Sequence, residues 1–344
     1  MPCQKILLIQ TAFIGDAILT SPLIREIRHF FPDARIDLIA NAGTVAIFKQ
    51  SPHLNHIYSF KKKPLTAKIG NYVKLLFQLR REKYDCAVSI QSYMTSASLM
   101  LLAGIPRRIG FKRQKLLTDP IVHGGRMHRT EYYLSLMKAF TDKKFDRQTE
   151  IFWTETDEKR AVEIYQNLHF RHKFLLGIAP GSVWFTKRWP KENFIALLDL
   201  LQGAGIQIVL AGGPGEVALC EEIRQGTKNR DVISIAGQHS ITGSAAIIQK
   251  LDLMLVNDSA PLHLANAVKT DVIAIFGPTV RRFGFYPLRE NDTMLEVDLP
   301  CRPCRHNGGP ICPEAHFGCM RELKPELVLQ AIRKYLPETL AAKD

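Results

Sequence analysis

The chain has 344 residues, of which 46% are hydrophobic and 23% are charged, and these proportions exclude wholesale disorder. A chain of this length can form two domains that each bury a core. The apolar runs, such as 206–213 and 272–277, are too short to span a membrane, and the first residues lack the features of a signal peptide, so we expect a cytoplasmic protein.

The formal net charge of +13 is carried by the first part of the chain. Residues 1–150 contain 24 Lys and Arg against 11 Asp and Glu, whereas the remainder contains 22 of each kind. This asymmetry indicates that the N-terminal half meets something anionic: nucleic acid, a phosphorylated glycan or an acidic membrane surface. A charged surface that only keeps the protein in solution is the alternative.

In the N-terminal half, short apolar segments of strand length alternate with helical patterns. Residues 5–10 are predicted to form a strand, which is followed by a turn of small residues and by a helical pattern over 17–30. Further strands are predicted at 35–40 and 84–90. This alternation is typical of the parallel, doubly wound α/β sheet of a Rossmann-like domain.

The same alternation starts again in the second half of the chain. Strands are predicted at 174–179, 207–211, 253–256 and 271–276, each ending in a loop rich in Gly, Pro, Ser or Asp. A charged helix around 156–169 is the expected connector. We therefore expect two Rossmann-like domains and a final helical segment, with the boundaries 1–165, 166–322 and 323–344.

Ligands of open parallel sheets bind beyond the carboxyl ends of the strands, and four loops at these positions carry reactive groups. The first, T-A-F-I-G-D, has Gly15 in a tight turn and Asp16 near a helix start. The Asp16 carboxylate either offsets the helix dipole, which needs no ligand, or acts as a general base that takes a proton from a bound hydroxyl.

The second loop, A-P-G-S-V-W-F-T-K-R-W-P, also lies between a strand and a helix. It offers hydroxyl groups from Ser182 and Thr186 and positive charge from Lys187, which together indicate a diphosphate site. Alternatively, Trp184 and Trp189 fill the space between the domains. That packing would explain the aromatic residues but not the polar residues beside them.

The third and fourth loops are A-G-G-P-G-E, which ends at Glu216, and N-D-S-A-P-L-H. The glycine-rich turn is a weak signal by itself, although its carboxylate can accept hydrogen bonds from ribose hydroxyls. Asp258 or Ser259 suits the N-cap of the following helix, a role that needs no ligand. His263 lies four residues after Ser259, on the same helical face, and the F-G-P-T loop at 276–279 would line the same site.

Four of the seven cysteines form a compact C-x2-C-x7-C-x6-C array: Cys301, Cys304, Cys312 and Cys319. The spacing resembles a metal knuckle, so structural zinc is one interpretation. Reduced thiols or redox-sensitive pairs are the other, because a disulfide framework is less expected in a reducing cytoplasm. Cys3, Cys86 and Cys220 are scattered, and we expect them to be structural.

Together the four loops resemble the ADP-heptose:lipopolysaccharide heptosyltransferases, glycosyltransferase family 9, over nearly the whole chain. F-I-G-D, P-G-S followed by K-R-W-P, and N-D-S-x-x-x-H followed by F-G-P-T occur in that order, and K-R-W-P is most similar to heptosyltransferase II. The resemblance implies a GT-B fold, in which two Rossmann-like domains face each other across a cleft. It also implies a C-terminal helix that packs back on the N-terminal domain.

The resemblance further implies an inverting transfer of heptose from ADP-heptose to the inner core of lipopolysaccharide, with no metal and no cofactor. Asp16 would be the catalytic base. The implied donor-binding residues are Ser182, Thr186, Lys187, Glu216, Asp258, Ser259, Ala260 and His263, with Ala260 where relatives often have Gly. The sequence has no D-x-D triplet, so Lys187 and helix N-termini would neutralise the leaving group.

The acceptor implied by the resemblance is a lipid A–Kdo–heptose molecule, which is anionic and membrane-bound. The basic stretches 61–83 and 107–129 would attract it and would contact acidic headgroups, which places the enzyme peripherally at the inner face of the inner membrane. The first domain would then bind the acceptor and the second the nucleotide sugar.

Three rival functions fit parts of the sequence. A dehydrogenase is disfavoured because the first turn lacks G-x-G-x-x-G. A nucleotide-sugar epimerase of the same fold, or a family 9 transferase with another sugar or acceptor, is harder to separate. A nucleic-acid binder would explain the basic half but not the reactive groups at four strand ends, so we expect no nucleic-acid partner.

Overall fold

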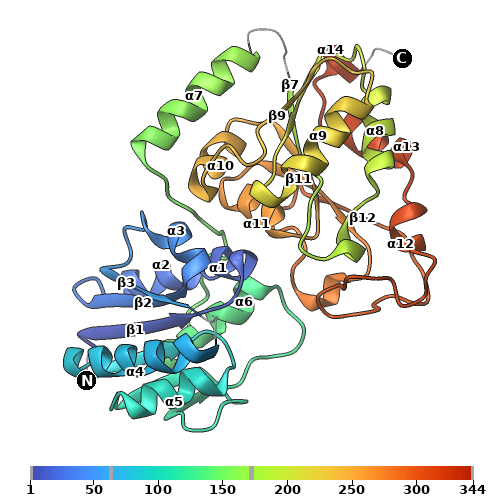
Figure 1. Ribbon diagram of the computed structural model, residues 1–344. Coiled ribbons are helices and arrows are strands. Elements are labelled where there is room, and N and C mark those ends of the chain that lie inside the picture. The colour runs from blue at the N-terminus through green and yellow to red at the C-terminus, as the bar shows by residue number, and fades with distance from the viewer. Residues whose placement is uncertain (1–2, 62–64, 170–173, 342–344) are drawn as a thin grey trace. The chain divides into compact units, whose positions relative to one another are not determined.

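The computed structural model describes residues 3–61, 65–169 and 174–341, and it contains two compact units that divide between Phe152 and Trp153 (Figure 1). Each unit contains one six-stranded parallel sheet. The two α/β units of the predicted fold class are therefore confirmed.

The first sheet has the strand order β3-β2-β1-β4-β5-β6. Its strands are β1 (Lys5–Gln10), β2 (Arg35–Asn41), β3 (His56–Phe60), β4 (Cys86–Ser89), β5 (Arg107–Phe111) and β6 (Asp119–Ile121). The helices around it are α1 (Ile14–Leu19), α2 (Ser21–Phe30), η1 (Ala42–Thr44), α3 (Val45–Phe48), α4 (Leu65–Glu82), α5 (Met94–Leu102), α6 (Arg129–Leu134) and η2 (Ser135–Ala139).

The central strand β1 is almost entirely apolar because helices cover both faces of the sheet (Figure 1). Alternate residues of the strand point to the same face, and Leu7 and Ile9 share one core cluster with Leu79 of α4 and Met100 of α5. The helix predicted at 17–30 is two helices, α1 and α2, which meet at Thr20.

The second sheet repeats this arrangement with the order β12-β11-β10-β7-β8-β9. Its strands are β7 (Phe174–Ala179), β8 (Ile206–Leu210), β9 (Val232–Ser234), β10 (Leu253–Asn257), β11 (Asp271–Phe276) and β12 (Thr293–Glu296). Its helices are α7 (Glu155–His169), η3 (Phe185–Lys187), α8 (Lys191–Leu200), η4 (Pro214–Glu216), α9 (Val217–Gly226), α10 (Ile241–Ile248), α11 (Ala260–Ala267), η5 (Arg281–Phe283), α12 (Gly318–Arg321), α13 (Pro325–Arg333) and α14 (Glu338–Ala341).

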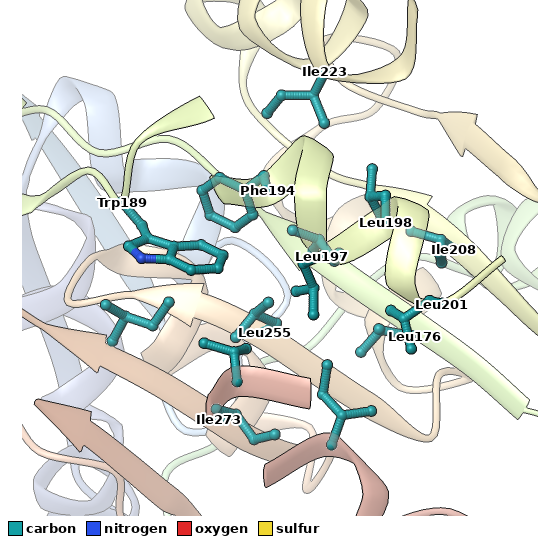
Figure 2. Close-up of a cluster of buried hydrophobic side chains, with 14 of the residues drawn as sticks. Leu176, Trp189, Phe194, Leu197, Leu198, Leu201, Ile208, Ile223, Leu255 and Ile273 are labelled. Atoms are coloured by element: carbon teal, nitrogen blue, oxygen red, sulfur yellow. The ribbon is translucent and has the colours of Figure 1, made fainter. Parts of the chain in front are cut away.

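The core of the second unit contains Trp189, whose side chain is only 1% exposed (Figure 2). The indole packs edge-to-face on Phe194 with ring centroids 4.8 Å apart, and its Nε1 donates a hydrogen bond to the carbonyl of Leu323 at 3.0 Å. Trp189 therefore packs within one unit. Trp184, the other tryptophan of this loop, is 40% exposed.

The ends of the two units are fixed by local contacts. Glu150 forms ion pairs with Arg25 at 3.1 Å and with His53 at 3.0 Å, so the segment that ends at Phe152 belongs to the first unit. The expected connector, α7, packs on α10 of the second unit, and the expected boundary at residue 165 falls inside this helix. The last long helix, α13, packs on α8 and contributes to the core of the second unit. Its packing on the first domain stays a prediction.

Candidate active site

Asp16 lies in the first turn of α1, directly after the strand β1. Its side chain is half-buried, and its carboxylate oxygen Oδ1 accepts a hydrogen bond from the hydroxyl of Tyr133 at 2.6 Å. The backbone carbonyl of Asp16 accepts a second bond from the hydroxyl of Thr20 at 2.7 Å, which closes the short helix. The carboxylate is thus oriented by a neighbouring helix, α6, and not only by its own loop.

Two glutamines lie beneath this carboxylate at the carboxyl ends of β1 and β4. Gln91 donates from Nε2 to the oxygen of Tyr133 at 3.1 Å and to Oε1 of Gln10 at 2.9 Å. Gln10 in turn donates from Nε2 to the hydroxyl of Thr20 at 2.5 Å. No role for Tyr133, Gln91 or Gln10 could be predicted from the sequence, because their proximity to Asp16 depends on contacts between segments far apart in the chain.

In the second unit, the carboxyl ends of the strands bring Lys187 and Asp258 together. The ammonium group of Lys187 lies 2.6 Å from Oδ2 of Asp258, and the two side chains are only 14% and 5% exposed. The hydroxyl of Thr279 donates to the same carboxylate oxygen at 2.5 Å. The second loop, the fourth loop and the F-G-P-T loop of the sequence analysis therefore meet at one buried ion pair.

Asn257, the last residue of β10, holds the second loop in place. Its amide nitrogen donates to the carbonyl of Pro180 at 2.8 Å, and its amide oxygen accepts from the backbone N–H of Trp189 at 3.1 Å. Because Asn257 is fully buried, these bonds replace the water contacts that both groups would otherwise lose. This role of Asn257 was not predicted, since one Asn at a strand end is not a specific signal.

Ser182 and Thr186 are both buried within the second loop. The carbonyl of Ser182 accepts a hydrogen bond from Nε of Arg188 at 2.7 Å, which curls the loop back on itself. The hydroxyl of Thr186 donates to the carbonyl of Gly309 at 3.1 Å and accepts from its N–H at 2.8 Å. Thr186 thus joins the loop to the cysteine-rich segment.

Glu216 lies beside the second loop. Its carboxylate accepts a hydrogen bond from the N–H of Gly213 at 2.8 Å. A Cβ atom built on Gly181 would lie 1.6 Å from Oε1 of Glu216, so only glycine leaves room for this carboxylate. The third loop is therefore packed directly against the second.

The helix α11 begins at Ala260 with Ser259 as its N-cap, and Pro261 lies in its first turn. The hydroxyl of Ser259 makes no capping bond and lies 3.5 Å from the carbonyl of Gly181. His263 is buried one turn later, with its ring centroid 6.1 Å from that of Phe285. Ser259 thus brings the fourth loop into contact with the second loop.

A buried arginine connects the F-G-P-T loop to the cysteine-rich segment. The Arg302 side chain is 5% exposed, and it donates to the carbonyls of Gly277, Val297 and Thr279, the last at 3.0 Å. Its guanidinium also pairs with the carboxylate of Glu296. This role of Arg302 was not predicted, although the residue lies between Cys301 and Cys304 of the cysteine array.

The cysteines of the array are all free thiols, and three of them line one small cavity next to Thr186: Cys304, Cys312 and Cys319. Burial raises the pKa of Cys319 to about 11, and burial together with the neighbouring Cys301 raises that of Cys304. Within the described residues, no three His, Cys, Asp or Glu side chains are grouped so that they would hold a metal ion.

The basic stretches of the first unit serve two purposes. Arg107 pairs with Asp119 at 3.0 Å, and Arg108 donates to the carbonyls of Leu116 and Ile105, so these two arginines stabilise β5 and its surroundings. Other cations are exposed to solvent: Lys74, Arg80, Arg81, Lys83, Lys112, Arg113, Lys115 and Arg126. Among the cations of these stretches whose exposure the structure describes, this second group and the exposed Lys61 are available to an anionic partner.

Among the residues that the structure describes, no helix is both long enough and apolar enough to cross a bilayer.

Comparison with known proteins identifies one family. Residues 72–313 match the model of glycosyltransferase family 9 (heptosyltransferase). The chain is 27% identical to lipopolysaccharide heptosyltransferase 3 of Escherichia coli (strain K12), over 96% of this chain and 97% of that protein. It is 28% identical to lipooligosaccharide heptosyltransferase 2 of Campylobacter jejuni (serotype O:2), over 97% and 98%.

Among solved structures, the E. coli ADP-heptose lps heptosyltransferase II matches 96% of this chain and 98% of its own with a TM-score of 0.77 at 22% identity. The predicted GT-B fold is therefore confirmed. Because the family model matches well over half of the sequence, the chain belongs to glycosyltransferase family 9, the heptosyltransferases.

Proposed function

We propose that this protein is an inverting heptosyltransferase that moves heptose from ADP-heptose to the inner core of lipopolysaccharide, most like heptosyltransferase II. The observation that carries the proposal is the buried pair of Lys187 and Asp258 at the strand ends of the second unit. The names of the relatives support the sugar and the acceptor class, and the resemblance of the K-R-W-P motif to heptosyltransferase II supports the finer assignment.

The second unit provides the donor site in this proposal. The Lys187 ammonium neutralises the diphosphate as ADP departs. Asp258, whose carboxylate accepts from the Thr279 hydroxyl, holds the ammonium in place before the donor arrives. Glu216 accepts hydrogen bonds from the ribose, while Ser182, Thr186, Ser259, Ala260 and His263 complete the donor site. A preorganised cation of this kind stabilises the leaving group without a metal.

The first unit provides the acceptor site and the base. Asp16 takes the proton of the attacking hydroxyl, a bond forms between that oxygen and the anomeric carbon, and the bond from this carbon to the diphosphate breaks. Attack from the face opposite the leaving group inverts the anomeric configuration. The alternative role of Asp16, in which it only offsets the dipole of α1, predicts no effect on turnover.

Acceptor-dependent release of ADP from ADP-heptose tests the reaction, because an epimerase would convert the nucleotide sugar without acceptor. Asp16→Asn is expected to lower turnover by about 10²- to 10⁴-fold while leaving affinity for ADP unchanged. Near-normal turnover of this variant would remove the base assignment. Acceptors with one and with two heptoses, and mass analysis of the lipopolysaccharide core of a deletion strain, separate heptosyltransferase II from III.

The outer face of α4 supports peripheral contact with an anionic membrane, and hence a location at the inner face of the inner membrane. Val73 and Phe77 lie one turn apart and are 42% and 57% exposed, and Lys74 and Arg81 are exposed on the same helix. A mixture of apolar and basic side chains is typical of helices that lie at a lipid interface.

Binding to vesicles with and without anionic lipid tests this contact. We expect Phe77→Ser to weaken binding and added salt to weaken it further. Phe30 is also an exposed phenylalanine, at 41%, and lies on α2, so Phe30→Ser is the control. Salt-independent binding, or equal loss in both variants, would contradict a docking role for α4.

A further inference from the structure

The phenol of Tyr133 is the group that holds the candidate base. Its hydroxyl donates to Oδ1 of Asp16 at 2.6 Å, which is short, as expected for a bond to a carboxylate. The Tyr133 side chain is only 1% exposed, because α6 packs on both α1 and α2. The phenol therefore has no freedom to leave the carboxylate without repacking the helix.

A backbone group determines the direction of this hydrogen bond. The N–H of Ala12 donates to the amide of Gln10 at 3.0 Å, so the contacting atom of Gln10 must be its oxygen. Gln91, which contacts the same oxygen at 2.9 Å, must then present its NH2 group there and also to Tyr133. The oxygen of Tyr133 accepts from Gln91, and its proton is directed to Asp16.

The charges around the pair keep this arrangement in place. Burial, reinforced by the negative charge of Asp16, raises the pKa of Tyr133 well above its ordinary value, so the phenol keeps its proton. The guanidinium of Arg129 lies 5.6 Å from the centre of the Tyr133 ring. Three other elements pack on α1. Of these, η1 and α3 contain no titratable side chain, and on α2 the side chains of Arg25 and Glu26 pair with each other.

We propose that Tyr133 is a positioning residue for the base: it fixes the carboxylate of Asp16 in one orientation and stabilises its ionised form. This inference rests on the proposed function, in which Asp16 is the base. The donated bond favours the carboxylate over the carboxylic acid, so Asp16 remains able to accept a proton at lower pH than it would alone. Tyr133 itself transfers no proton.

The test compares the pH profile of kcat/KM for Tyr133→Phe with that of the wild-type enzyme, using ADP-heptose and the lipid-linked acceptor. Removing the donor destabilises the carboxylate, so the acid limb is expected to move to higher pH by about one unit, the size expected for one charge-assisted bond. The KM for ADP-heptose is expected to stay unchanged. Loss of structure alone would lower activity at every pH without moving the limb.

Tyr132→Phe is the matched control. The neighbouring Tyr132 stacks on Phe111 at 4.0 Å, and its hydroxyl lies 3.5 Å from that of Ser92, so its profile should coincide with that of the wild type. If Tyr133→Phe does not fold, Gln91→Met removes the group that directs the phenol and should shift the acid limb in the same direction by a smaller amount.

Two failures are distinguishable. If Asp16→Asn keeps normal turnover, the base assignment of the proposed function fails, and the role of Tyr133 fails with it. If Asp16→Asn is inactive but the acid limb of Tyr133→Phe coincides with that of the wild type, only the positioning role is overturned. An acid limb displaced in Tyr133→Phe and unchanged in Tyr132→Phe supports the proposal.

Discussion

The buried pair of Lys187 and Asp258 makes a prediction in which structural and functional effects separate. Lys187→Met removes the cation that lies 2.6 Å from Asp258 and leaves a carboxylate that is 5% exposed with the neutral hydroxyl of Thr279 as a partner. Breaking one half of a buried ion pair typically costs about 3–5 kcal/mol. We therefore expect Lys187→Met to lower the free energy of unfolding of the second unit by that amount.

The double variant Lys187→Met/Asp258→Asn removes both charges and keeps an oxygen that can accept from Thr279. Replacing both members of a buried ion pair by uncharged side chains often changes the free energy of unfolding little. More than half of the stability that Lys187→Met loses is therefore expected to return. ADP binding is expected to behave differently. The affinity for ADP should fall about tenfold to a hundredfold in the single variant and remain low in the double variant, because both variants lose the cation that is proposed to bind the diphosphate.

Tryptophan fluorescence is a suitable readout for the urea denaturation of these variants. The three tryptophans, Trp153, Trp184 and Trp189, all belong to the second unit, and Trp189 is in its core. Calorimetric titration with ADP gives the affinity. Wild-type ADP affinity in the double variant would refute a donor role for Lys187, and an unchanged urea midpoint in Lys187→Met would refute the buried ion pair.

Three further predictions concern single groups. Gly181→Ala places a methyl group on the Glu216 carboxylate, so ADP affinity measured by titration should fall, whereas unchanged affinity would exclude Glu216 from the donor site. Burial opposes the ionisation of Glu150, but His53 and Arg25 outweigh burial and hold the pKa of Glu150 below its ordinary 4.5. The stability that the Glu150 carboxylate contributes is therefore present above pH 4.5 and is lost as the pH falls below that value. The difference in melting temperature between the wild type and Glu150→Gln should accordingly become smaller below pH 4.5. Burial raises the pKa of the Cys220 thiol to about 12, so Cys220 should remain unmodified when the folded protein is alkylated at pH 8. Peptide mass analysis measures the modification, and fast labelling of Cys220 would contradict its burial.

The alternation of strands was predictable because a parallel sheet covered on both faces needs continuous apolar strands. The segments 5–10, 174–179 and 271–276 coincide with β1, β7 and β11. The strand β5 was missed because its sequence begins with two arginines, which were assigned to an anionic partner. The edge strands β6 and β9 have three residues each, which is too short for a hydrophobic pattern to be recognised in the sequence.

The site was predictable where one loop contains its own chemistry. Lys187 and Asp258 each follow a strand, and the carboxyl ends of parallel strands share one edge of the sheet, so their meeting follows from the topology. Tyr133 and Asn257 could not be predicted in the same way. The hydrogen bond of Tyr133 joins residues 117 positions apart, and that of Asn257 depends on the register between β7 and β10.

The cysteine-rich segment gains a structural meaning from Arg302, whichever chemistry its thiols have. Arg302 lies between Cys301 and Cys304 and donates to the carbonyl of Thr279 at 3.0 Å, and the hydroxyl of Thr279 holds Asp258. On the other side of the segment, Gly309 is tied to Thr186 by two hydrogen bonds to its hydroxyl.

A displacement of residues 301–309 therefore reaches the pair of Lys187 and Asp258 from two directions. Because a buried arginine with several carbonyl partners cannot move without leaving those partners unpaired, the segment and the donor site are expected to be ordered together. The array is thus better understood as a support of the second loop and the F-G-P-T loop than as an independent module. Variants of its cysteines should be examined by ADP affinity as well as by metal content.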